Sequence, residues 1–200
     1  MSPLKQIAIF ASGAGTNAQK IIDHFRNNKS IKVALILCNK PNAGVLTIAQ
    51  KERIPCVIIE KENFFSGDHY LNILKEKKID FLVLAGFLWM LPAELIKTYP
   101  GKIINIHPAL LPKYGGKGMF GNHIHEEVIK NKEKESGITI HFADEMYDHG
   151  QIIFQAKCII EKNETAESLA KKIHELEYKN FPKTIELVIN LQNIVKTQTP

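Results

Sequence analysis

The chain has 200 residues, of which 44% are hydrophobic and 24% are charged. A chain of this length and apolar content can bury one good core, so we expect a single domain over residues 1–200. The formal net charge of +5 mildly favours anionic ligands. Lysines and glutamates alternate along the sequence instead of forming a basic stripe, which argues against a nucleic-acid partner.

The three cysteines, Cys38, Cys56 and Cys158, have no metal-binding or redox spacing. Each lies in or beside an apolar, strand-like run, so we expect buried free thiols in a reducing compartment. The longest apolar run, residues 81–91, ends at Pro92 and is too short to span a bilayer. We therefore predict a cytoplasmic protein with no membrane partner.

Short apolar runs alternate with longer amphipathic runs in the first half of the chain. This alternation is typical of parallel strands joined by helices. It predicts an α/β, Rossmann-like fold whose mainly parallel, twisted sheet carries helices on both faces. The expected strands are 6–11, 32–38, 56–59, 81–85 and 102–107, and the expected helices are 17–27, 44–53, 68–77 and 92–98.

The first strand leads into Ser12-Gly13-Ala14-Gly15-Thr16-Asn17 and then into a helix. Glycines let the backbone approach an anion closely, and the free amides at a helix start donate hydrogen bonds to it. The segment therefore predicts a phosphate-binding loop. It also satisfies the Gly-x-Gly-x-x-Ala pattern of nicotinamide enzymes, but the second strand ends without an acidic residue to hold a ribose 2′-hydroxyl. A tight turn without a ligand is the third interpretation.

Asn105 and His107 end the strand expected at 102–107. Residues i and i+2 of a strand point to the same face, so these two side chains can address one bound atom together. Pro108 then ends the strand. An amide donor beside an imidazole at a strand exit is suited to polarising a carbonyl group, although either side chain alone can be structural.

Beyond residue 110 the pattern changes to a helix at 123–131, strands at 137–143 and 151–160, and helical periodicity from Ala166 to the end. No linker, repeat or low-complexity segment indicates a second domain. His123 and His125 open the first of these helices, where their side chains diverge by roughly 200° and cannot share an ion. We therefore predict no metal site.

Asp148 lies in a glycine-ended turn before the strand expected at 151–160. A carboxylate in such a turn can approach the exit of a neighbouring strand, where it would hold His107 in one tautomer and favour the imidazolium. Aspartate in turns is also common for local reasons, because its side chain caps backbone amides. Residues Asn105, His107 and Asp148 thus form a candidate catalytic set.

Three motifs occur together in this chain: the segment 12–17, the run Asn105-x-His107-Pro108-x-Leu110-Leu111-Pro112, and Asp148-x-Gly150. In this combination and order, the chain resembles the folate-dependent phosphoribosylglycinamide formyltransferases of purine synthesis over almost its whole length. The Asn-x-His-Pro-x-Leu-Leu-Pro run is shared by enzymes that use 10-formyltetrahydrofolate, so it indicates the reaction type. The segment 12–17 narrows the acceptor to glycinamide ribonucleotide.

The resemblance implies two sets of ligand contacts. The substrate set comprises Gly15, Thr16, Asn17, His174, Glu175, Leu176 and Glu177, with residues 15–17 on the phosphoribosyl part and Glu177 most specifically on the ribose. The folate set comprises Leu88, Trp89, Met90, Leu91, Asn105, Thr139, His141 and Asp144. Without the resemblance, His141 is nearly as well explained as a core histidine, and residues 174–177 as an ordinary helix surface.

The resemblance also implies a mechanism and two small-molecule partners. The amine of glycinamide ribonucleotide attacks the formyl carbon of 10-formyltetrahydrofolate, and Asn105 with protonated His107 donates hydrogen bonds to the developing oxyanion. Asp148 keeps His107 charged, and it or a held water moves the amine proton. Residues 1–100 would bind the ribonucleotide phosphate and residues 101–200 would carry catalysis and the folate, in a monomer or homodimer.

The sequence departs from the family at three places. Gly67 and Trp89 stand where arginines are often found, and the loop at 114–121 is longer and rich in glycine, which predicts a mobile lid. Two other functions stay open. A formyltetrahydrofolate hydrolase would share the Asn, His and Asp set, and a non-catalytic nucleotide-binding module would explain only the glycine-rich segment.

Overall fold

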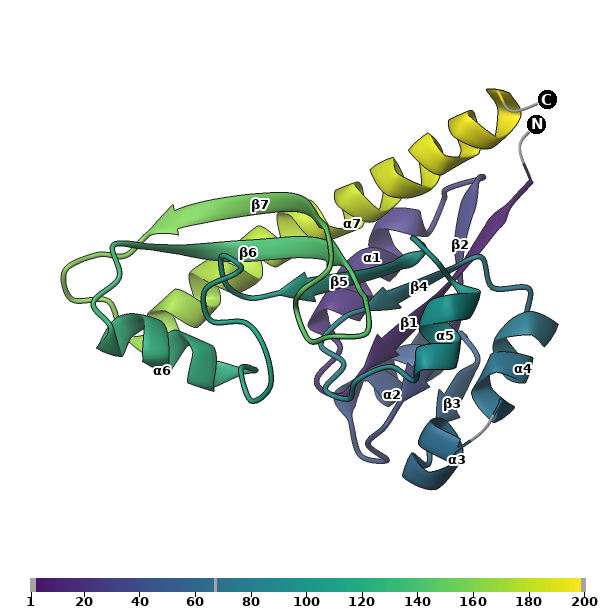
Figure 1. Cartoon of the computed structure of the whole chain (residues 1–200), viewed down its shortest axis with the longest axis horizontal. Coiled ribbons are helices and arrows are strands. Elements are labelled where there is room, and N and C mark those ends of the chain that lie inside the picture. The colour runs from purple at the N-terminus through teal and green to yellow at the C-terminus, as the bar shows by residue number, and fades with distance from the viewer. Residues whose placement is uncertain (1–2, 67, 199–200) are drawn as a thin grey trace.

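The computed structural model describes residues 3–66 and 68–198, and Figure 1 shows its elements. The strands are β1 (Lys5–Ala11), β2 (Ile31–Cys38), β3 (Cys56–Ile58), β4 (Phe81–Leu84), β5 (Ile103–His107), β6 (Glu135–Phe142) and β7 (Ile152–Ile159). The helices are α1 (Thr16–Phe25), α2 (Gly44–Lys51), α3 (Lys61–Ser66), α4 (His69–Glu76), α5 (Ala93–Thr98), α6 (Asn122–Lys130) and α7 (Ala166–Gln198). Every element expected from the sequence is present. Helix α3 was not predicted, because six residues are too few to show helical periodicity.

The strands form one sheet in the order β3-β2-β1-β4-β5-β6-β7. Strands β1 to β5 are parallel, whereas β6 pairs antiparallel with both β5 and β7. The predicted α/β class with a mainly parallel sheet is therefore confirmed. The connection from β6 to β7 carries no helix, as antiparallel neighbours allow, whereas the longer connection from β5 to β6 carries α6.

Strand β1 shows how the sheet is covered on both faces. Successive side chains alternate, so Ile7 and Ile9 point to one face and Ala8 and Phe10 to the other, and all four are fully buried. The first pair belongs to a core cluster with α1, α2, α6 and α7, and the second to a cluster with α3, α4 and α5. Helices thus lie on both faces, as predicted.

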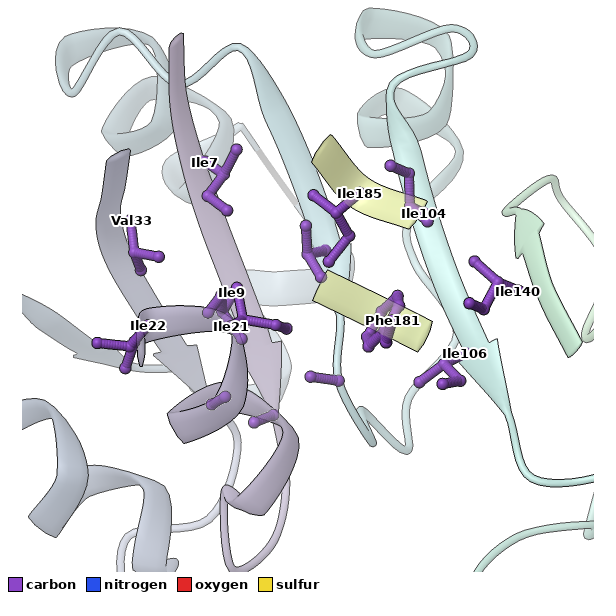
Figure 2. Packing of buried hydrophobic residues seen from close by; sticks show 14 of the residues in the cluster. Ile7, Ile9, Ile21, Ile22, Val33, Ile104, Ile106, Ile140, Phe181 and Ile185 are labelled. Atoms are coloured by element: carbon purple, nitrogen blue, oxygen red, sulfur yellow. The ribbon is translucent and has the colours of Figure 1, made fainter. Parts of the chain in front are cut away.

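Helix α7 has 33 residues, so it spans roughly 50 Å. Phe181 and Ile185 in its middle are fully buried, and Figure 2 shows them beside the sheet strands together with Ile21 of α1. Figure 1 shows α7 crossing the face of the sheet and projecting beyond it near the N-terminus. This packing fixes the part of the helix that carries His174 and Glu177.

The chain order places a crevice beside β1. From β1 the chain moves outward to β2 and β3, and it then returns to add β4 and β5 on the other side of β1. The loops that follow β1 and β4 therefore diverge at the carboxyl ends of these two neighbouring strands. In open α/β sheets this is where ligands bind.

The expectation of three buried thiols is wrong for Cys56. Cys38 lies in the inner strand β2 and is fully buried, whereas Cys56 is exposed and Cys158 is only partly buried. Both of these residues lie on edge strands, β3 and β7, which have a neighbouring strand on one side only. The prediction from hydrophobic sequence runs therefore overestimated the burial of side chains on the two edge strands.

No helix within residues 3–66 and 68–198 is long and apolar enough to cross a membrane. The same residues contain no group of three or more His, Cys, Asp or Glu side chains arranged to hold a metal ion.

Candidate active site

A cavity of about 840 Å³ opens at the carboxyl ends of β1 and β4. Its wall consists of residues 12–17 after β1, residues 84–91 at the end of β4, residues 105–108 at the end of β5, residues 116–122, the turn at 143–148, and side chains of α6 and α7. This is the position that the strand order predicts. We call residues 12–17 the glycine loop.

The structure brings Asn105, His107 and Asp148 together at one end of the cavity. Oδ1 of Asp148 lies 3.4 Å from Nδ2 of Asn105, and its Oδ2 lies 3.4 Å from Nδ1 of His107. One carboxylate therefore faces both side chains that strand alternation places on the same face of β5. Asp148 itself has a φ of 54°, and this left-handed turn conformation is one that aspartate tolerates.

A backbone carbonyl determines the tautomer of His107. Nε2 of His107 lies 2.7 Å from the carbonyl oxygen of Tyr114, and a carbonyl can only accept a hydrogen bond. Nε2 must therefore carry a proton in this conformation. Nδ1 is left to face the carboxylate of Asp148.

His141 orients the amide of Asn105. Nδ1 of His141 donates to the carbonyl oxygen of Phe142 at 2.8 Å, so its Nε2 accepts from Nδ2 of Asn105 at 2.9 Å. The amide nitrogen of Asn105 is thereby turned toward Asp148 and the cavity. We call Asn105, His107, His141 and Asp148 the Asp148 cluster.

The carboxylate of Asp148 is ionised although it is largely buried. Burial alone would raise the pKa of this carboxyl, because it removes the charge from water. Hydrogen bonds from His107 and from the backbone N–H of Gly116, 3.0 Å from Oδ2, outweigh burial and hold the pKa of Asp148 well below its usual range. The cluster therefore presents a fixed negative charge to whatever cation forms beside it.

The glycine loop forms the opposite end of the cavity. Gly15 has a φ of 80°, and a Cβ atom there would lie 2.8 Å from Cα of Val45, so this position requires glycine. Around Gly13, by contrast, a Cβ would meet nothing within 4 Å. Helix α1 starts directly after Gly15, and the N–H groups of its first turn have no partner within the helix.

Lys40 also lines the cavity, beside the glycine loop. It follows β2, so the parallel sheet brings it to the same edge as the loop after β1. Reasoning from the sequence missed this residue. The signal was available, because a lysine directly after an inner strand of a parallel sheet lies at the ligand-binding edge.

Glu177 of α7 is buried at the same end of the cavity. Its Oε2 accepts hydrogen bonds from Nδ2 of Asn17 and from Nδ1 of His174, both at 2.9 Å. The bond to Glu177 raises the pKa of His174 above its ordinary value. The glycine loop and α7, 160 residues apart in sequence, thus form one polar wall.

Two predicted contacts on α7 point away from the cavity. His174, Glu177 and Tyr178 line it, because residues three and four positions apart share one face of a helix. Glu175 is exposed to solvent, and Leu176 packs against the core cluster below α7. Neither residue lines the cavity, because each helical residue turns by about 100° from the last, so the geometry gives no support to their predicted substrate contacts.

Thr139 is fully buried and does not line the cavity. Its hydroxyl donates to the carbonyl oxygen of Ala109 at 2.7 Å, and it accepts from the N–H of Leu111 at 2.9 Å and from Nε2 of Gln155 at 2.8 Å. The side chain therefore supports the turn after β5. The geometry therefore gives no support to its predicted contact with the folate.

The remaining residues predicted for the folate lie on the cavity wall: Leu88, Trp89, Met90, Leu91, Asn105, His141 and Asp144. Trp89 packs against Phe64, Phe65 and Phe87, with ring centroids 5.9, 5.8 and 6.3 Å away. This side of the cavity is consequently apolar and aromatic. Gly67, which was predicted from the sequence to stand where an arginine is often found, lies outside the described residues.

The loop at 114–121 is held at its beginning. The carbonyl of Tyr114 accepts from His107, and the N–H of Gly116 donates to Asp148. Further along, Gly118 and Gly121 have positive φ, and the side chain of Phe120 is 54% exposed. The start of the loop is therefore part of the Asp148 cluster, whereas its predicted motion stays a prediction.

A doubly wound sheet, a glycine loop at its switch point and a buried amide, imidazole and carboxylate are the features expected of an α/β enzyme that activates a carbonyl group beside an anionic ligand. The family model described as formyl transferase matches residues 5–185. The chain belongs to this family, and membership implies a folate-type co-substrate.

Individual relatives agree with this assignment. The chain is 33% identical to phosphoribosylglycinamide formyltransferase of Bacillus subtilis, over 95% of this chain and 97% of that protein. The crystal structure of phosphoribosylglycinamide formyltransferase from Bacillus halodurans superimposes with a TM-score of 0.83 at 37% identity, covering 92% of this chain and 95% of that one.

Other relatives are longer than this chain. It is 35% identical to the chloroplastic phosphoribosylglycinamide formyltransferase of Arabidopsis thaliana over 90% of its own length, but it spans 64% of that protein. It is 36% identical to the trifunctional purine biosynthetic protein adenosine-3 of Drosophila melanogaster, of which it spans 14%.

Proposed function

We propose that the enzyme transfers the formyl group of 10-formyltetrahydrofolate to the amine of 5′-phosphoribosylglycinamide. The products would be formylglycinamide ribonucleotide and tetrahydrofolate, in de novo purine synthesis. The observation that carries this proposal is one continuous cavity with an anion-binding loop at one end and the Asp148 cluster at the other. The names of the relatives in Bacillus and Arabidopsis support it.

The ribonucleotide would bind along the polar wall. Its phosphate would accept hydrogen bonds from the glycine loop and the first turn of α1, with Lys40 as the nearby positive charge. The ribose hydroxyls would donate to Glu177, which Asn17 and His174 already hold in position. This places the glycyl amine toward the Asp148 cluster.

The formyl-folate would enter from the aromatic side. Residues 88–91 would receive the pterin ring, while Trp89 adds an apolar surface and His141 and Asp144 border the formyl end. The apolar wall excludes water from the reacting carbonyl, which strengthens the hydrogen bonds made there. We propose no metal in this reaction.

The chemistry would proceed through a tetrahedral intermediate. The amine forms a bond to the formyl carbon while the carbonyl π electrons move to oxygen, and Nδ2 of Asn105 and Nδ1–H of His107 donate to this oxyanion. Ionised Asp148 stabilises the imidazolium and directs the amine proton, through a water, toward the folate nitrogen. The carbon–nitrogen bond to the folate then breaks and restores the carbonyl.

The proposal is tested by mixing the purified protein with 10-formyltetrahydrofolate and measuring tetrahydrofolate release with and without glycinamide ribonucleotide. We expect release that requires the ribonucleotide, and mass spectrometry should find the added formyl group on its amine. The Asp148→Asn variant serves as the control with an impaired site. Release without the acceptor would show a hydrolase, and no release with either would leave a binding module.

Three further predictions from the sequence belong with this proposal. The enzyme would act in the cytoplasm as a monomer or homodimer. The first half of the chain would provide the phosphate-binding loop, and the second half most of the catalytic and folate-binding groups.

A further inference from the structure

His125 is a buried polar residue on the cavity wall that the mechanism above does not use. It lies on α6, it is 3% exposed, and its ring lines the cavity. Within the described residues, Nδ1 of its imidazole is shielded from solvent and has no hydrogen-bond partner. Its neighbour on the same helix, His123, is exposed and does not line the cavity.

An unpartnered buried nitrogen is unfavourable in the free protein. Leaving a buried polar group without a hydrogen bond typically costs about 1–3 kcal/mol. Such groups need an explanation, and a common one is a ligand that completes the hydrogen bond. His125 is a lining residue of the cavity, and a half-turn of its ring exchanges the places of Nδ1 and Cδ2 without moving α6, so the ring can adjust its nitrogen to a bound ligand.

The surroundings of His125 place it between the two ends of the cavity. The titratable groups close enough to influence its charge are His174 and Glu177 of α7 and His107 at the end of β5. Burial, followed by His174, lowers the pKa of His125, so the imidazole is neutral near neutral pH. A neutral imidazole both donates and accepts one hydrogen bond, which suits an uncharged polar partner.

We propose that His125 binds the ribonucleotide substrate through the amide that joins its ribose to the glycyl group. The inference rests on the proposed function, because that function supplies the ligand. The phosphate lies at the glycine loop and the ribose at Glu177, whereas the amine must reach Asn105 and His107. The amide is the part of the substrate that spans this interval, and it is uncharged.

The contact would position the amine without taking part in the chemistry. A hydrogen bond to the amide fixes the rotation of the glycyl group about the bond that follows the ribose. The amine is then held on the line of attack toward the formyl carbon. His125 is consequently a positioning residue that acts in ribonucleotide binding and leaves the folate site untouched.

The first experiment compares His125→Leu with the matched variant His123→Ala in steady-state kinetics and thermal unfolding. We expect His125→Leu to raise the ribonucleotide KM about tenfold, the value of one hydrogen bond in a buried site, with an unchanged formyl-folate KM. The Tm of the ligand-free protein should stay the same or rise, because the variant removes an unsatisfied nitrogen. His123→Ala should change neither constant.

A second measurement identifies the part of the substrate that His125 contacts. Ribose 5-phosphate carries the phosphate and the ribose hydroxyls but lacks the glycinamide. By calorimetry, His125→Leu should weaken the binding of glycinamide ribonucleotide about tenfold and leave ribose 5-phosphate unchanged. The variant His125→Asn, whose amide nitrogen can occupy the place of Nδ1, should recover part of the affinity.

The results separate this inference from the proposed function. A wild-type protein without ribonucleotide-dependent transfer would overturn both. An active wild type with unchanged ribonucleotide affinity in His125→Leu would overturn the role of His125 alone, and equal weakening for ribose 5-phosphate would overturn the contact with the amide. A fall in Tm with both KM values unchanged would show a purely structural histidine. The His125→Ala variant covers the case in which leucine overpacks the site.

Discussion

The two ends of the cavity differ in how completely the protein satisfies its own polar groups. In the Asp148 cluster, Asn105, His107 and His141 all have hydrogen-bond or ion-pair partners within the described chain. Elsewhere on the cavity wall, within the described chain, Oδ1 of Asn17 in the glycine loop and Nδ1 of His125 between the two ends are buried without a partner. The Asp148 cluster is therefore already hydrogen-bonded, whereas the rest of the wall keeps unpaired buried atoms that the proposed ribonucleotide substrate would complete.

This difference corresponds to two different tasks. Catalytic groups stabilise a transition state best when they need not reorient during the reaction, and the Asp148 cluster meets this requirement before any ligand binds. A binding end gains specificity when a wrong ligand leaves buried polar atoms unpaired. Changes at the Asp148 end should therefore lower kcat, and changes at the other end should raise the ribonucleotide KM.

The largest effect is expected for Asp148→Asn, which removes the charge but keeps the shape. The imidazolium of His107 loses its counter-charge, so kcat should fall by about 10²–10⁴ while both KM values stay near wild type. Combining it with His107→Ala should be scarcely worse than His107→Ala alone, because the two residues act as a unit. Fully additive losses in kcat would show that Asp148 works independently of His107.

The variant Asn105→Ala removes one donor to the proposed oxyanion. One such donor is typically worth roughly 3 kcal/mol in the transition state, so kcat should fall by about 10² or more. Ribonucleotide affinity, measured by calorimetry, should stay close to wild type. A turnover close to wild type would exclude Asn105 from the chemistry.

The glycine loop offers a matched pair of variants at the other end. Gly13→Ala fits the free protein, since its Cβ meets nothing within 4 Å, but it should obstruct the approach of the phosphate and raise the ribonucleotide KM about tenfold. Gly15→Ala instead clashes with Val45 and should lower Tm. If Gly13→Ala raised both KM values equally, the loop would not be the phosphate site.

The smallest effect concerns the ion pair of His174 and Glu177. Because Glu177 raises the pKa of His174, the stability from this pair is present below the unfolded-state pKa of about 6.5 and is lost as pH rises through the folded-state pKa. The Tm difference between wild type and His174→Gln should therefore be larger near about pH 6 than near about pH 9. A difference independent of pH would mean that the charge of His174 contributes nothing.

Much of the fold and the centre of the site were predictable from local patterns. Alternation along β5 placed Asn105 and His107 on one face, and the strand-to-helix turn after β1 located the glycine loop. Both predictions depend only on neighbouring residues in the sequence. The same is true of the strand and helix pattern, which the structure confirms.

What could not be predicted depends on contacts between distant segments. The carbonyl oxygen of Tyr114 determines that Nε2 of His107 carries a proton. A sequence pattern does not show which backbone carbonyl lies beside a given side chain. Thr139 was assigned to the folate through the family resemblance, but the turn after β5 uses its hydroxyl. The pair His123 and His125 was interpreted only as a question of metal binding, and its separation into one exposed and one buried ring depends on the packing of α6 against α7.

Trp89 is the only tryptophan in the chain, and it lies on the aromatic wall of the cavity among Phe64, Phe65 and Phe87. Tryptophan emission responds to the polarity around the indole ring, so the unmodified protein contains a fluorophore at one end of its own cavity. A ligand that covers this wall should change the emission, whereas one confined to the glycine loop lies beside no tryptophan. Titrations of the two substrates can therefore be distinguished spectroscopically without labelling the protein.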